Sequence, residues 1–65
     1  MRPTVIILKE DLRKNSNLGQ ELSQLSDKVK ELEAACQYFP SDGNLVEFMK
    51  ILIKYNLDYE LQYQE

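Results

Sequence analysis

The sequence predicts a small α+β domain whose elements follow the order strand, helix, helix, strand. Three observations predict it: a β-branched apolar run near the start, a long stretch with apolar residues at helical spacing, and an alternating apolar and polar run near the end. A chain of 65 residues makes one small domain with a thin core. We therefore expect a helical hairpin packed on a short antiparallel ribbon and completed by dimerisation.

The first predicted element is a strand at residues 4–8, which read Thr-Val-Ile-Ile-Leu directly after Pro3. Residues branched at the β carbon favour the pleated conformation. Because this strand would be apolar on both faces, it needs cover on each side or a place inside a sheet.

The second and longest predicted element is a helix at residues 17–38, in which apolar residues repeat at steps of four and three. This spacing is typical of the a/d seam of a heptad repeat. The seam consists of Leu18, Leu22, Leu25, Val29, Leu32, Cys36 and Phe39. Asn17 and Gln20 have the spacing of a capping box, and an earlier start capped by Asp11 is the alternative. Pro40 disfavours helical geometry beyond the predicted end.

A shorter helix is predicted at residues 45–55, where Asn44 and Glu47 have the spacing of a second capping box. This helix carries more apolar surface than one neighbouring helix covers. Residues 57–63 then alternate between Leu or Tyr and acidic or amide side chains, which is typical of a half-buried strand with one wet face.

The two predicted helices differ in length, and the difference leaves part of the seam open. At about 1.5 Å per residue the first spans roughly 33 Å and the second about 18 Å. Leu18, Leu22 and Leu25 are therefore expected to lie uncovered within one chain, and a lone two-stranded ribbon is marginal in water. A second copy, or another protein, would cover them.

The composition favours a folded, cytoplasmic protein without a cofactor. The hydrophobic fraction of 43% is ordinary for a folded domain. With no histidine and one cysteine, the chain offers neither an intrachain disulfide nor a zinc site, and Cys36 is expected to be a small buried hydrophobe. Val5 to Leu8 is too short for a signal peptide or a membrane span. Asp58 and Glu60 are expected to be solvent-exposed strand residues.

No set of residues in the sequence indicates catalysis or a small-molecule substrate, so we expect the protein not to be an enzyme. The prediction is a protein-binding regulator, adaptor or inhibitor that acts through an apolar seam and a tyrosine-rich acidic strand. The predicted partner-binding residues are Leu18, Leu22, Leu25, Tyr55, Tyr59 and Tyr63.

The alternative prediction is a small nucleic-acid-binding dimer that uses Lys9, Arg13 and Lys14. The first 14 residues carry four basic and two acidic side chains, whereas the rest of the chain carries four basic and nine acidic ones. Duplex affinity comes largely from clustered phosphate contacts, so the acidic body makes this the weaker hypothesis.

Overall fold

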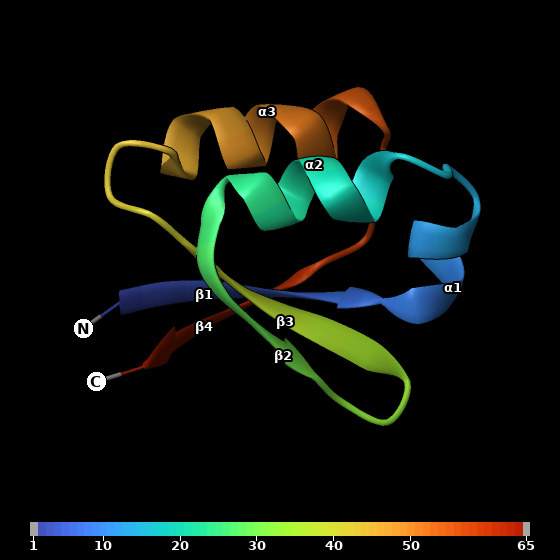
Figure 1. The fold of residues 1–65 in the computed structure, drawn as a ribbon, viewed down its shortest axis with the longest axis horizontal. Helices are drawn as coiled ribbons and strands as arrows, with labels where there is room; N and C mark the ends of the chain where they lie inside the picture. Colours follow the sequence, from blue (N-terminus) through green and yellow to red (C-terminus); the bar gives the residue numbers. More distant parts are fainter. Residues whose placement is uncertain (1, 65) are drawn as a thin grey trace.

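Seven elements follow one another along residues 2–64, the part of the chain that the structure, a computed structural model, describes (Figure 1). They are β1 (Arg2–Leu8), α1 (Lys9–Arg13), α2 (Leu18–Gln24), β2 (Ser26–Glu31), β3 (Ala35–Pro40), α3 (Leu45–Lys54) and β4 (Glu60–Gln64).

The four strands form one antiparallel sheet in the order β2-β3-β1-β4. Helices α2 and α3 lie on the same side of this sheet, and α1 lies at the end of β1 (Figure 1). The order of strands and helices is that of the split β-α-β arrangement of ferredoxin-like domains, with α1 added before α2. This arrangement hosts many unrelated functions, so it describes a shape and not an activity.

The α+β class is confirmed, but the helical hairpin on a two-stranded ribbon is wrong. The expected helix at residues 17–38 ends at Gln24, and the rest of that stretch forms the β2–β3 hairpin. The chain turns after Leu25, where the Ser26 hydroxyl donates to the Leu22 carbonyl at 2.8 Å and the Ser41 N–H donates to the Leu25 carbonyl at 2.9 Å. The heptad spacing was therefore a coincidence of one helix followed by two strands.

The other three expected elements are present, with shifted ends. The strand expected at 4–8 lies within β1, the helix expected at 45–55 is α3, and the strand expected at 57–63 begins later, at Glu60. A short helix, α1, fills the region where an earlier helix start was the alternative. Neither Asn17 nor Asn44 makes a side-chain capping hydrogen bond, so both helix starts were predicted at the right place without the expected bond.

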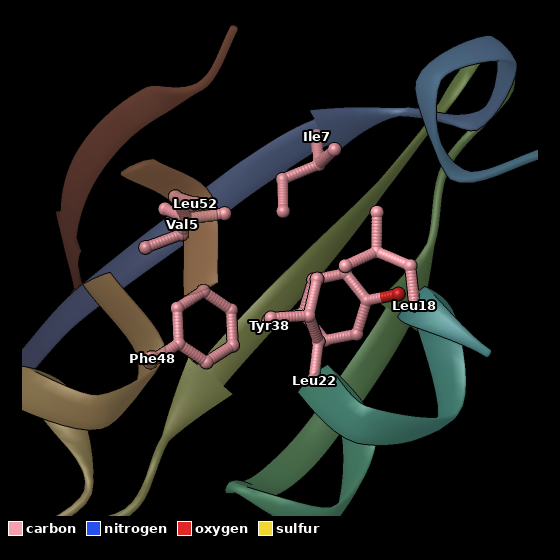
Figure 2. Close-up of a cluster of buried hydrophobic side chains, with 7 residues drawn as sticks. All are labelled: Val5, Ile7, Leu18, Leu22, Tyr38, Phe48 and Leu52. Carbon is pink, nitrogen blue, oxygen red and sulfur yellow. The ribbon is translucent and has the colours of Figure 1, made fainter. Parts of the chain in front are cut away.

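The core lies between the sheet and helices α2 and α3 (Figure 2). It consists of Val5, Ile7, Leu18, Leu22, Tyr38, Phe48 and Leu52, all at most 3% exposed. The Tyr38 and Phe48 rings pack with their centroids 5.7 Å apart in a tilted arrangement. The expectation that Leu18 and Leu22 lie uncovered was therefore wrong. Because α2 ends at Gln24 and the chain then turns into β2, both leucines pack on the strands of the same chain.

Helix α3 ends in a backbone motif that turns the chain toward β4. Asn56 adopts a left-handed conformation with φ of 53°, which asparagine tolerates better than most residues. The Leu57 N–H then donates to the Leu52 carbonyl at 2.9 Å, and the Asn56 N–H donates to the Ile53 carbonyl at 3.1 Å. These are the two bonds of a Schellman motif, and they satisfy carbonyls that the end of a helix leaves free.

Candidate functional site

The side of the sheet opposite α2 and α3, here called the open face, carries every second residue of each strand. Since Val5, Ile7 and Tyr38 point into the core, their neighbours along the strands point to the open face. In the middle of this face the Gln37 amide donates to the Thr4 hydroxyl at 2.9 Å, and that hydroxyl donates to the Gln62 carbonyl at 3.0 Å. These buried polar groups satisfy one another and link β3, β1 and β4.

A small hollow, here called the Leu8 hollow, opens at the end of β1. It is lined by Ile6, Leu8, Asp58, Tyr59 and Glu60 and has a volume of about 200 Å³. Ile6 and Leu8 come from the open face of β1, while Glu60 pairs with Ile6 in the sheet register. The chain leaving α3 therefore places Asp58 and Tyr59 beside the end of β1.

The chemistry of the Leu8 hollow is an apolar floor with carboxylates at its margin. Leu8 is 48% exposed and Tyr59 is 44% exposed, so both offer apolar surface to solvent. Asp58 and Glu60 are exposed as expected, but Asp58 precedes β4 and is not a strand residue. Among residues 2–64, no basic side chain lines the hollow. A cationic group that carries apolar surface complements such a site.

The three tyrosines predicted to bind a partner do not share one surface. Tyr59 lines the Leu8 hollow. Tyr63 is 62% exposed and lies on the helix side of the sheet, because it is two residues from Leu61, the partner of the core residue Val5. Tyr55 is half-buried against the core, and the Lys54 ammonium lies 5.6 Å from the centre of its ring.

The three leucines predicted to bind a partner belong to the interior. Leu18 and Leu22 are 1% and 0% exposed, and Leu25 is partly buried against the same core. Their side chains pack within the chain and form no open apolar seam.

Two of the three predicted nucleic-acid residues, Lys9 and Arg13, are the first and last residues of the short helix α1. Lys9 and Arg13 line two further hollows, of about 400 and 320 Å³, and Leu8 borders the smaller of these. The Lys9 ammonium lies 3.0 Å from a Glu31 carboxylate oxygen, and the Lys14 ammonium lies 3.5 Å from one of Asp11. Neighbouring carboxylates thus offset much of the charge on which the alternative prediction rests.

A second basic group, on β1 and β2, was missed because Lys28 was placed in the helix expected at residues 17–38. The Arg2 guanidinium and the Lys28 ammonium lie 5.8 and 5.4 Å from the centre of the Phe39 ring, distances typical of cation–π contacts. Arg2 also forms an ion pair with Asp27. Hydrogen bonds from the Ser41 hydroxyl and from Arg2 lower the pKa of Asp27 below 3.8, the ordinary value for an aspartate.

Cys36 is half-buried and packs against the core, next to Lys9 and Arg13. Among residues 2–64, no group of three or more cysteine and carboxylate side chains is placed to hold a metal ion. Within the same residues, no helix combines the length and apolar character needed to cross a membrane.

Ile6 and Leu8 are the residues of the Leu8 hollow that sequence reasoning missed. The signal was present, since the first strand was recognised as apolar on both faces while only one face finds cover.

Comparison of the chain with protein-family models, curated proteins and solved structures gives no match.

Proposed function

We propose that the protein is a non-enzymatic binding module that acts in the cytoplasm as a regulator, adaptor or inhibitor by capturing a segment of another protein at the Leu8 hollow. The observation that supports this is the pairing of exposed apolar side chains, Leu8 and Tyr59, with the carboxylates of Asp58 and Glu60. Exposed apolar groups rimmed by charge are typical of protein interaction sites.

The size of the hollow favours a side chain over a small molecule. Its volume is about 200 Å³, whereas small-molecule sites usually begin at roughly 300 Å³. We infer that one apolar side chain of the partner packs on Leu8 and Tyr59. A lysine or arginine beside that anchor would then meet Asp58 and Glu60.

Selection from a library of short random peptides displayed on phage tests this proposal. We expect enrichment of an aliphatic or aromatic residue next to Lys or Arg. In a titration of a selected peptide followed by fluorescence anisotropy, Tyr59→Ala should weaken binding at least about fivefold, since truncating an aromatic anchor typically costs more than about 1 kcal/mol. Asp58→Asn with Glu60→Gln should weaken binding and reduce its dependence on salt.

Tyr63→Ala is the matched control, because it removes the same side chain from the opposite side of the sheet. Binding by this variant should equal that of the unchanged protein. A selection without the basic and apolar pattern, or a peptide that responds to Tyr63→Ala and not to Tyr59→Ala, would contradict the proposed site.

Nucleic-acid binding is the second candidate, and the group of Arg2, Lys28 and Phe39 favours it more than Lys9, Arg13 and Lys14 do. An aromatic ring beside cations on a four-stranded sheet suits the stacking of an unpaired base. The same titration with generic single-stranded RNA in place of the peptide discriminates the two. Binding that falls steeply with salt and weakens in Phe39→Ala would favour this candidate, and absence of binding at low salt would remove it.

A further inference from the structure

The two edges of the sheet differ in how well they are protected against pairing with another strand. The β2 edge carries a bulge between Ser26 and Lys28, and Asp27, Lys28, Lys30 and Glu31 place charges along it. Bulges and charged side chains are the usual means by which edge strands avoid pairing. The β4 edge has a regular register with β1, and its only charged residue within Glu60–Gln64 is the first one.

The backbone of β4 presents unpaired groups along this edge. The Lys9 N–H donates to the Ala34 carbonyl at 3.0 Å, so the odd-numbered residues at this end of the chain point their backbone groups toward β3. Even-numbered β1 residues then bond to β4, and their register partners are Glu60, Gln62 and Gln64. It follows that the N–H and C=O groups of Leu61 and Tyr63 point outward.

The sequence of β4 is self-complementary when two copies run antiparallel about Gln62. In that register Leu61 of one copy lies opposite Tyr63 of the other, and the outward backbone groups of these two residues meet as a hydrogen-bonded pair. Glu60 lies opposite Gln64, so no like charges face each other, and Gln62 lies opposite itself. Aliphatic and aromatic residues opposite one another stabilise a sheet.

We propose that two copies of this chain associate through their β4 strands, centred on Gln62, to form one continuous sheet of eight strands. This surface shares Glu60 with the Leu8 hollow, but the proposal rests on the backbone and register of β4 and not on the hollow, so it stands independently of the proposed function. It accounts for the exposure of Leu61 and Tyr63, which are 39% and 62% exposed in the single chain.

The dimer is closed and small. The same strand is used by both copies about a twofold axis, and the charged, bulged β2 edges that remain at its ends do not continue the sheet. A five-residue strand gives a short seam. It buries less than the roughly 1,600 Å² of a standard interface, so the association should be weak and should depend on protein concentration.

Charge substitutions at Gln62 test the register directly. Gln62→Lys places two lysines opposite each other at the twofold axis, and Gln62→Glu does the same with two glutamates. Sedimentation velocity over increasing concentration should show a dimer for the unchanged protein and monomer for each variant alone. An equimolar mixture of the two variants should form the heterodimer, because opposite charges then face each other across the axis.

Circular dichroism of each variant provides the folding control, since Gln62 is partly exposed and its backbone remains able to pair with Thr4. A monomer at every concentration for the unchanged protein would overturn the proposal. So would a dimer strengthened by Gln62→Lys alone, because that result indicates a shifted register in which residue 62 faces Glu60. A mixture of folded variants that stays monomeric would equally exclude pairing centred on Gln62.

Discussion

Arg2 connects three parts of the structure through one guanidinium. It forms an ion pair with Asp27 on β2, donates to the Phe39 and Pro40 carbonyls at 3.1 and 3.3 Å, and lies against the Phe39 ring. These contacts fix the start of β1 against the far end of β3.

The contacts of Asp27 predict a dependence of stability on pH. Its pKa is lowered in the folded state, first by the Ser41 hydroxyl, which donates at 2.7 Å, and then by Arg2. Because the pKa of Asp27 is lowered on folding, its ionised carboxylate stabilises the fold at pH values above the ordinary pKa of about 3.8. This stabilisation is lost as the pH falls through the pKa of the folded state. The free energy of unfolding in urea should therefore fall more between pH 6 and about pH 3 for the unchanged protein than for Asp27→Asn.

Asp42→Asn, at another exposed aspartate, is the control for this measurement. Its loss of stability on acidification should match that of the unchanged protein. Equal losses for all three proteins would show that the Ser41 and Arg2 contacts contribute nothing in solution. Because Asp27 is exposed, the difference should also shrink at high salt.

Among the elements, α2 and the β2–β3 hairpin show where local pattern misleads. Leu32, Glu33 and Ala34 are good helix formers, yet they form the hairpin loop. As part of a strand, Tyr38 reaches the core and packs on Phe48, and the Gln37 amide donates to the Thr4 hydroxyl on the other face. Burial between elements distant in sequence thus overrides local helix propensity.

The elements that the sequence does predict are those with a purely local signal. β1 is a β-branched run, α3 has one polar side over ten residues, and β4 alternates. The sequence shows that β1 is apolar on both faces, but it does not show which face stays open, because that depends on the side of the sheet on which the helices pack. Tyr59 was predicted to bind a partner because tyrosine is enriched at protein interfaces, but its neighbours Ile6 and Leu8 lie far from it in sequence.

Alanine substitution at the two glycines should change the free energy of unfolding in opposite directions. A Cβ at Gly19, inside α2, would lie 3.8 Å from the Tyr38 hydroxyl, an ordinary contact. Gly19→Ala should therefore raise the free energy of unfolding by about 0.5–1 kcal/mol through helix propensity. Gly43 has a φ of +87° and open space around it, so Gly43→Ala should lower that free energy by about 1 kcal/mol through backbone strain alone.

Thermal unfolding of the two variants against the unchanged protein provides the measurement. Because both changes add the same methyl group, each serves as the matched control for the other. If Gly19→Ala destabilises the protein, α2 must pack more closely on Tyr38 than the distance of 3.8 Å indicates.

For the whole molecule, the core makes α2 a structural element and not a binding surface. Leu22→Ala should lower the free energy of unfolding by about 2–5 kcal/mol, because it leaves a cavity at a fully buried site. Ile53→Ala, at a residue of α3 that is 73% exposed, should change it by less than about 0.5 kcal/mol. Urea midpoints measured by circular dichroism compare the two.

If Leu22→Ala unfolds this small domain entirely, Leu22→Met keeps the test informative, since a swap of similar volume should cost less than about 1.5 kcal/mol. Equal, small effects of Leu22→Ala and Ile53→Ala would contradict the placement of α2 over the sheet. They would restore Leu22 as a surface residue available to a partner.

The central position of β1 has a consequence for how the chain folds. β1 bonds to β3 and to β4, and the Thr4 hydroxyl meets a carbonyl 58 residues further along the chain. Folding rates fall as contacting residues become more distant in sequence, so this domain should fold more slowly than a helical hairpin of its length. During synthesis, β1 lacks its β4 partner until the last strand of the domain emerges. In that interval its unpaired backbone edge and its apolar side chains are exposed to aggregation.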